Sequence, residues 1–167
     1  MAKSPFTRKG FSLVKLYLMQ HALAYPAEQD SERTLSPAGI DQAKKAARGI
    51  KRLGLSFDLI IASPKRRSHQ TAALVAEAVR FPYSDILTTE TILPDRSPQD
   101  LFALLQKESA ASHILVIGHM PHLAKLASDL LRGGELLIEN AGLTCFDIAG
   151  PGSVRLEFHL RAIQLAL

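Results

Sequence analysis

Three short apolar segments, each followed by polar residues and then by a helical pattern, constrain the fold of this chain more than any other feature. They occupy residues 13–19, 57–62 and 113–117. Apolar runs of this length are typical of strands buried on both faces of a parallel sheet. Connection rules then place the intervening helices on both faces of that sheet. We therefore expect an α/β fold with three layers, α/β/α, and a mostly parallel central sheet.

Proline residues mark the starts of the helices between these strands. A proline at the first helical position, in two cases after a serine N-cap, predicts helix starts at Ser36-Pro37, Ser63-Pro64 and Pro121. The first of these helices should end at Gly54 and bury a stripe of residues at helical spacing, namely Ile40, Ala43, Ala47, Ile50 and Leu53. The other expected elements are a short edge strand, a further helix and a closing antiparallel hairpin, at residues 86–88, 101–105 and 143–160.

The length of 167 residues and the 47% apolar content suit one domain with a real core. We expect that domain to span residues 12–167. Residues 1–11 lack periodicity and contain proline and glycine, so they are expected to form a flexible arm. Cys145 is the single cysteine and falls in an apolar run, which predicts a buried, unreactive thiol in a reducing compartment.

The formal charge of +4 is spread over helical segments, and aromatic residues make up only 6% of the chain. This pattern argues against nucleic-acid binding, whereas a mild basic balance suits a site for anionic phosphate. No apolar run approaches the roughly 20 residues that a membrane span requires. The first apolar run is cut by Lys15 and Gln20 and has no small-residue cleavage site, so we expect a cytoplasmic protein without membrane contact.

Polar residues follow three of the expected strands: Gln20-His21, the turn at residues 63–67, and Gly118-His119. The carboxyl ends of parallel strands meet at one edge of a sheet, where open α/β sheets place their chemistry. Two imidazoles, the guanidinium of Arg67 and free N–H groups at helix starts would bind a compact dianion such as phosphate or sulfate. A neutral imidazole can attack phosphorus and form a labile phosphohistidine, which predicts hydrolysis without a metal or cofactor.

Four motifs resemble, in order and spacing, the histidine phosphatase superfamily. They are Leu-Met-Gln-His-Ala at 18–22, Arg-Thr-Leu-Ser at 33–36, Ser-Pro-Lys-Arg-Arg-Ser-His-Gln-Thr at 63–71 and Ile-Gly-His-Met-Pro at 117–121. The third is the most specific. The resemblance is strongest to the short SixA-type phosphohistidine phosphatases, covers nearly all of the chain from about residue 14, and implies a phosphoglycerate mutase-like fold.

The same resemblance implies roles for individual residues. His21 would be the nucleophile that becomes phosphorylated, while Arg67 and His119 would hold the phosphoryl oxygens in the transition state. Arg33 resembles an arginine that lines the same pocket. Glu90 occupies roughly the place where larger relatives carry a general acid.

The chain departs from the family pattern at Gln20-His21-Ala22, where the family usually has Arg-His-Gly. Gln20 removes one positive charge from the pocket but keeps an N–H donor, and losing one such donor costs about 3 kcal/mol, or on the order of a hundredfold in rate. Arg33 or Arg66 could offset part of this loss. Ala22 would strain the turn only if its φ angle were positive.

The length leaves no room for an inserted lid, so we expect an open crevice that accepts a phosphorylated side chain of another protein. Imidazole, with a reference pKa of about 6.5, leaves without a strong general acid, which favours phosphohistidine on a partner protein as the substrate. One alternative is a small-molecule phosphomonoesterase, in which Glu90 would protonate the leaving alkoxide. Another is a weakly active domain that only binds phosphorylated partners, because Gln20 weakens the pocket.

Less specific interpretations remain for the same residues. His21 could be a structural histidine and Arg67 a solvated helix residue. His119 and His122 stand three residues apart, but no carboxylate or cysteine stands at ligand spacing, so no metal site is expected. His122 is interpreted as a helix-face residue.

Overall fold

The computed structural model describes residues 13–108, 110–150 and 152–167, so the arm predicted at residues 1–11 lies outside the described part. The strands are β1 (Val14–Gln20), β2 (Leu59–Ala62), β3 (Leu87–Thr88), β4 (His113–Gly118), β5 (Leu143–Gly150) and β6 (Ser153–Leu160). The α-helices are α1 (Pro37–Arg52), α2 (Arg66–Val79), α3 (Pro98–Lys107), α4 (His122–Leu131) and α5 (Ala162–Ala166).

The strands form one mixed sheet in the order β3-β2-β4-β1-β5-β6. Strands β1 to β4 pair in parallel, whereas β5 runs antiparallel to β1 and forms a hairpin with β6. The predicted mostly parallel sheet and the closing hairpin are therefore confirmed. In the register, Gln20 lies opposite Gly118 and Ala62 lies opposite Ile117. The ends of β1, β2 and β4 thus coincide at one edge of the sheet.

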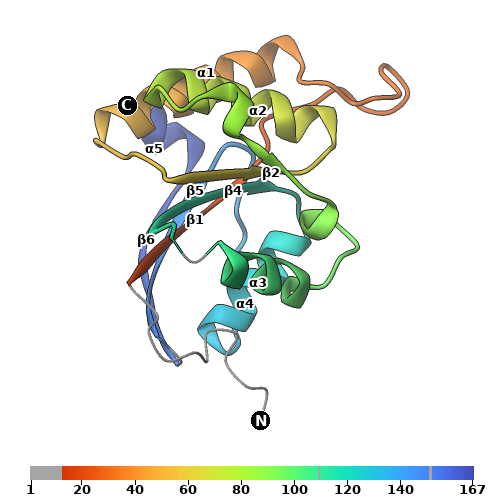
Figure 1. Ribbon diagram of the computed structural model, residues 1–167. Coiled ribbons are helices and arrows are strands. Elements are labelled where there is room, and N and C mark those ends of the chain that lie inside the picture. The colour runs from red at the N-terminus through yellow and green to blue at the C-terminus, as the bar shows by residue number, and fades with distance from the viewer. Residues whose placement is uncertain (1–12, 109, 151) are drawn as a thin grey trace.

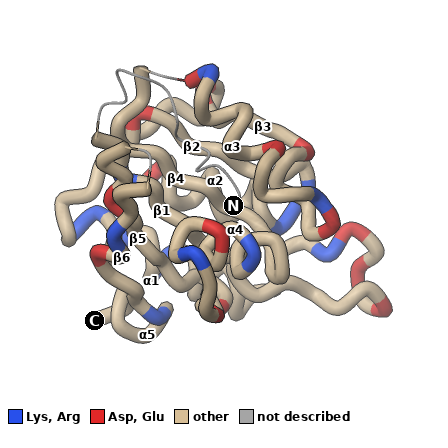
Figure 2. The backbone as a smooth tube through the Cα atoms, turned by 90° about the horizontal axis from the view of Figure 1, so that it is seen from below, with Lys and Arg blue, Asp and Glu red and all other residues tan. Residues whose placement is uncertain are grey.

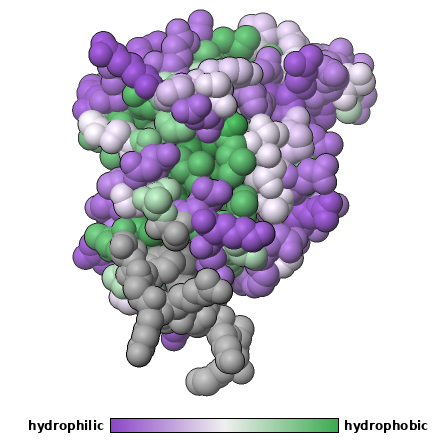
Figure 3. All heavy atoms as spheres, viewed as in Figure 1, coloured by the Kyte–Doolittle hydropathy of each residue, from purple (hydrophilic) through white to green (hydrophobic). Residues whose placement is uncertain are grey.

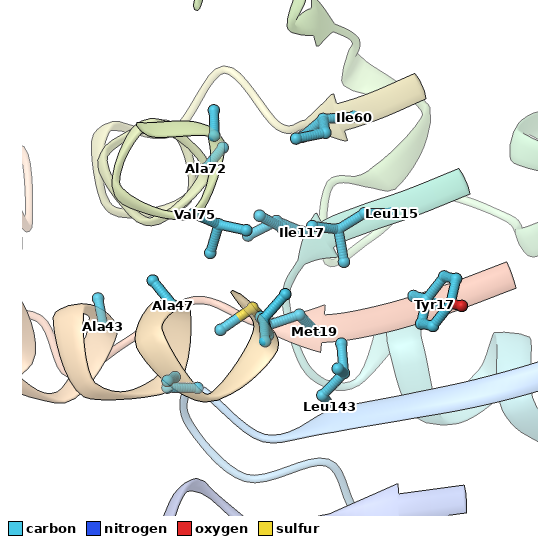
Figure 4. Close-up of a cluster of buried hydrophobic side chains, with 14 of the residues drawn as sticks. Tyr17, Met19, Ala43, Ala47, Ile60, Ala72, Val75, Leu115, Ile117 and Leu143 are labelled. Atoms are coloured by element: carbon cyan, nitrogen blue, oxygen red, sulfur yellow. The ribbon is translucent and has the colours of Figure 1, made fainter. Parts of the chain in front are cut away.

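The helices cover both faces of the sheet, as Figure 1 shows, with α1, α2 and α5 on one side and α3 and α4 on the other. Alternation along β1 divides its side chains between two cores: Tyr17 and Met19 face the α1/α2 side, and Leu16 and Leu18 face the opposite side. Figure 4 shows the first core, in which side chains from α1 and α2 pack against side chains from β1, β2, β4 and β5. The predicted three-layer α/β/α architecture is confirmed.

Helix α1 begins as predicted, with Ser36 accepting a hydrogen bond from the backbone N–H of Gly39. On its inner face, Ala43, Ala47 and Ile50 are buried as predicted, whereas Ile40 and Leu53 are exposed. The face consists mainly of small residues that let the backbone approach its neighbours. A Cβ atom added at Gly39 would lie 1.7 Å from the carbonyl oxygen of Leu23. That close approach holds the chain after β1 against α1.

Two other helices begin one or two residues later than predicted. Helix α2 begins at Arg66 with Lys65 at the N-cap, and α4 begins at His122. Ser63 does not cap α2 because its hydroxyl contacts His119 and the Lys65 backbone instead. The short C-terminal helix α5 was not predicted, and it packs on α1, where Gly49 leaves room for the carbonyl of Leu165.

The surface carries charges of both signs. Figure 2 shows acidic and basic segments interspersed along the chain, and Figure 3 shows mainly hydrophilic residues around a smaller apolar area. Cys145 is buried as predicted. Among the described residues, no helix is both long and apolar enough to span a bilayer.

Candidate active site

Three of the predicted site residues come together at the carboxyl edge of the sheet. His21 follows β1, Arg67 lies in the first turn of α2, and His119 follows β4. The Nε of Arg67 donates to Nε2 of His21 at 3.1 Å, and the two imidazole centroids are 5.1 Å apart. All three side chains are more than nine-tenths buried. The segments that carry them lie far apart in the sequence, and the coinciding strand ends bring them into contact.

The ring of His21 is held in one orientation. Its Nδ1 lies 2.7 Å from the carbonyl oxygen of Ala22, an acceptor only, so Nδ1 carries the proton and donates. Nε2 is then unprotonated, and its lone pair accepts the hydrogen bond from Arg67. The backbone is held as well, because the His21 carbonyl accepts from Asn140 at 2.8 Å and the Ala22 N–H donates to Thr71 at 3.0 Å.

His21 is neutral near pH 7. Burial is the main cause that lowers its pKa to about 4, and the charges of Arg67 and Arg33 lower the pKa further against the opposing effect of the Ala22 hydrogen bond. A neutral imidazole with its proton fixed on Nδ1 presents Nε2 as a nucleophile.

His119 is also neutral, and one of its ring nitrogens lacks a partner. Burial, followed by His21 and the cations Arg67 and Lys65, lowers the pKa of His119 to about 3. Nε2 lies 2.6 Å from the hydroxyl oxygen of Ser63. Nδ1 is buried without a hydrogen-bond partner among the described residues. An unpaired buried polar atom is costly unless a ligand satisfies it.

The electrostatics of the cluster favour an anion. Burial, and then the charge of Arg33, lowers the pKa of Arg67, which reflects the crowding of positive charge. Within the described residues, no ion pair joins a carboxylate to His21, Arg67 or His119. A buried cation without a counter-ion is stabilised when an anion binds.

Gln20 and Ala22, the two departures from the family pattern, lie at the end of β1 and directly after His21. Gln20 is half-buried. Ala22 is not among the residues with positive φ, so the strain considered for this position does not occur. Ala22 is fully buried, and its backbone groups serve as the ring acceptor for His21 and as a donor to Thr71.

Arg33 and Arg66 differ as sources of compensating charge. Arg33 is exposed, has a φ of 51° and donates to the carbonyl of Tyr25 at 3.4 Å, while its charge acts on both His21 and Arg67. Arg66 instead pairs with Glu32 at 3.0 Å. Of the two cations, only Arg33 therefore supplies unneutralised charge to the cluster.

Glu90 lies apart from the cluster. Its exposed carboxylate pairs with Arg96 at 3.4 Å and lines an open depression of about 380 Å³ with Thr91 and Asp100. Among the described contacts, none joins Glu90 to His21, Arg67 or His119. Glu90 stands beyond β3 at the same edge of the sheet.

Several residues that hold the site were not singled out from the sequence. Ser63, Asn140 and Gln70 contact His119, the His21 carbonyl and the Leu35 N–H, respectively. Ser63 and Gln70 lie in the Ser-Pro motif, which could have indicated them. Asn140 precedes β5 without any pattern, so nothing in the sequence pointed to it.

His122 is fully buried at the start of α4 and is not a surface residue of that helix. Burial lowers its pKa, and the nearby Lys125 lowers it further. In the described part of the chain, no group of three His, Cys, Asp or Glu side chains is arranged to hold a metal ion.

Comparison with known proteins supports the motif-based resemblance. A family model described as the histidine phosphatase superfamily (branch 1) matches residues 16–90. An uncharacterized protein of a Picosynechococcus species is 27% identical over 154 residues, which cover 87% of this chain and 90% of the relative. The phosphohistidine phosphatase SixA of Escherichia coli is 28% identical over 128 residues, which cover 72% of this chain and 76% of the relative.

Solved structures of other proteins share the fold of this chain. The protein histidine phosphatase SixA, complexed with tungstate, matches with a TM-score of 0.82 at 21% identity, covering 91% of this chain and 99% of that one. At this identity the likeness concerns the fold. The predicted phosphoglycerate mutase-like fold is thereby confirmed.

Proposed function

We propose that this chain is a phosphatase of the histidine phosphatase superfamily in which Nε2 of His21 accepts the phosphoryl group. One observation carries the proposal: the Nδ1–H of His21 is bound to the Ala22 carbonyl, so the free lone pair of Nε2 faces the guanidinium of Arg67. A nucleophile and a cation for the phosphoryl oxygens are thus in contact before substrate binds.

In the first step, the lone pair of Nε2 attacks phosphorus as the bond to the leaving group breaks. Arg67, which donates to Nε2 in the free protein, transfers its hydrogen bond to a phosphoryl oxygen, since a charge-assisted bond to a dianion is stronger than one to a neutral ring. The unpaired Nδ1 of His119 marks a second position for such an oxygen. The products are phosphohistidine at His21 and the leaving group, which takes the electron pair of the broken bond. A leaving imidazole that carries a proton on its other nitrogen departs as the neutral ring.

In the second step, water attacks phosphorus and the bond to Nε2 breaks. The electron pair returns to the His21 ring, and the water proton passes to the phosphate that is released. The positive charge that both steps require comes from Arg67, Arg33 and the N–H groups at the start of α2, so the proposed reaction needs neither a metal nor a cofactor.

The proposed substrate is phosphohistidine on a partner protein. SixA, with which 128 residues align, is named a phosphohistidine phosphatase. The chemistry agrees with this, because imidazole leaves without strong acid assistance and no carboxylate contacts the cluster in the described residues. A phosphomonoesterase would instead need Glu90 to leave Arg96 and protonate an alkoxide. A domain that only binds phosphorylated partners remains the alternative if Gln20 leaves turnover too slow.

Turnover assays separate these functions. The protein, with chelator present, should release phosphate from a phosphohistidine-containing domain faster than from simple phosphate esters, and a rapid quench should trap phosphate on His21. Faster hydrolysis of the esters would favour the phosphomonoesterase. Binding of the phosphorylated domain without any turnover would favour the binding function.

A further inference from the structure

The side chain of Ser63 forms a hydrogen bond with the imidazole of His119. It follows β2, is fully buried, and its hydroxyl oxygen lies 2.6 Å from Nε2 of His119. The same oxygen accepts a hydrogen bond from the Lys65 N–H at 3.1 Å. The Ser63 N–H donates in turn to Ser68, which donates to the carbonyl of Ile117. The hydroxyl is therefore fixed in position from both sides.

Two proton arrangements are compatible with this contact, and they differ in what they leave unpaired. If Ser63 donates to Nε2, the neutral ring carries its proton on Nδ1, and only that Nδ1–H lacks a partner. If Nε2–H donates to Ser63 instead, both the serine proton and the Nδ1 lone pair lack partners, because the described contacts give the hydroxyl no further acceptor. Since each buried unpaired group costs stability, the first arrangement is favoured.

A second effect acts in the same direction. The Lys65 N–H donates into the serine oxygen at the start of α2, and a hydroxyl that already accepts a hydrogen bond becomes a better donor. The positive end of the helix dipole also lies at this point. The Ser63 hydroxyl, which accepts from the Lys65 N–H, is thus set to act as the donor in its hydrogen bond with His119.

We infer that Ser63 is a positioning residue that holds His119 as the Nδ1–H tautomer, so that an unpaired N–H donor waits for a phosphoryl oxygen beside His21. The inference rests on the proposed function for its role in catalysis, but the tautomer is a property of the free protein. His119 stays neutral mainly because burial lowers its pKa. The groups that face it lower the pKa further: His21 from the end of β1, Lys65 and Arg67 from the start of α2, and His122 from α4.

The test compares Ser63→Ala with Ser68→Ala, which also loses one buried hydroxyl but removes no direct contact with His119 among the described residues. In the free wild type near pH 7, ¹⁵N spectra should show His119 as a single neutral tautomer with the proton on Nδ1. Ser63→Ala should lose this preference and Ser68→Ala should keep it. A wild-type ring with its proton on Nε2 would overturn the inference, even if Ser63→Ala failed to fold.

Inorganic phosphate and turnover supply the second readout. Phosphate should shift the Nδ1–H resonance of His119, and an unshifted resonance at saturating phosphate would contradict the inference. The kcat/KM of Ser63→Ala should fall by about 10- to 100-fold, less than the loss on removing an oxyanion donor itself. The kcat/KM of Ser68→Ala should stay within roughly threefold of wild type, because this variant removes no donor to the phosphoryl group.

The two proposals fail in different ways. If the wild type hydrolyses no phosphohistidine substrate but His119 is the Nδ1–H tautomer and responds to phosphate, the proposed function fails and the role of Ser63 in setting the donor stands. If the wild type is active but Ser63→Ala matches it in rate and in tautomer, the inference about Ser63 fails and the proposed function stands.

Discussion

Polar side chains cluster at both ends of strand β1, but among the described residues only the cluster at its start contains both cations and carboxylates. At its start, Lys15 is bonded to Asp147 at 2.7 Å and to Glu157, and Arg155 completes the set. Cations and carboxylates alternate there, so each charge has a partner. These hydrogen bonds raise the pKa of Lys15 and lower the pKa of Asp147.

Beyond the end of the same strand, two neutral imidazoles and a buried guanidinium meet without carboxylates in the described part of the chain. His21, Arg67 and His119 are buried together, the charge of Arg33 acts on this cluster, and burial and mutual repulsion lower all three pKa values. The first cluster is complete within the protein and stabilises the fold. The second lacks an anion, and perturbed groups of this kind mark functional sites. The predictions below exploit this difference, from the largest expected effect to the smallest.

The largest expected effect is on turnover in His21→Ala. Removing the nucleophile should reduce kcat by about 10⁵-fold or more and abolish the trapped phosphoenzyme. The melting temperature should change little, because the variant removes a group that burial and neighbouring cations already disfavour in its charged form. Residual activity within tenfold of wild type would show that His21 is not the nucleophile.

The clusters should respond to acid in different pH windows. The folded pKa values of His21 and His119, about 4 and 3, lie below the ordinary imidazole value of 6.5, so the unfolded chain binds protons first as the pH falls. Stability is therefore lost below about pH 6.5, down to about pH 4 for His21 and about pH 3 for His119, by up to about 1.4 kcal/mol per pH unit for each imidazole. Asp147 has a depressed pKa, so its contribution to stability is present above the ordinary carboxyl value of 3.8 and is lost only in more acidic solution.

Denaturant titrations at several pH values check this separation. In His21→Asn, the free energy of unfolding should fall less steeply between about pH 6.5 and 4, because one imidazole no longer takes part. The loss of stability in more acidic solution should be unchanged. An equal slope in wild type and variant would mean that His21 has an ordinary pKa in the folded protein.

Lys15→Met should affect stability and not activity. Asp147 is nearly buried and would keep only Arg155 as its partner, so unfolding should become easier by about 1–2 kcal/mol, a value reduced for the partial exposure of Lys15. Phosphatase activity at 25 °C should remain within about twofold, since the site lies at the other end of β1. A large loss of kcat would show that the two ends are coupled.

Gln20→Arg tests the charge balance of the site itself. Adding a cation at the end of β1 should raise kcat/KM by about tenfold, part of the hundredfold that one oxyanion donor supplies. Arg33 already contributes charge there, which limits the gain. Gln20→Lys serves as a control for charge without the planar guanidinium. A Gln20→Arg variant no faster than wild type would contradict the charge argument.

Much of the architecture could be predicted from local pattern. The apolar runs and the serine–proline pair before α1 predicted the strands, the helices and the three layers, because burial and capping depend on residues close in sequence. The exposure of Ile40 and the helix α5 could not be predicted. They depend on how closely small residues such as Gly39 and Gly49 let distant backbone approach α1.

The same division holds at the site. The sequence alone determined that His21, Arg67 and His119 follow strand ends or open helices, and parallel strands bring such positions to one edge. Only the tertiary structure decided which nitrogen of His21 is unprotonated and that Glu32 neutralises Arg66. It also decided that Ser63 contacts His119 and does not cap a helix. Hydrogen-bond partners and burial depend on atoms many residues apart, which no local pattern records.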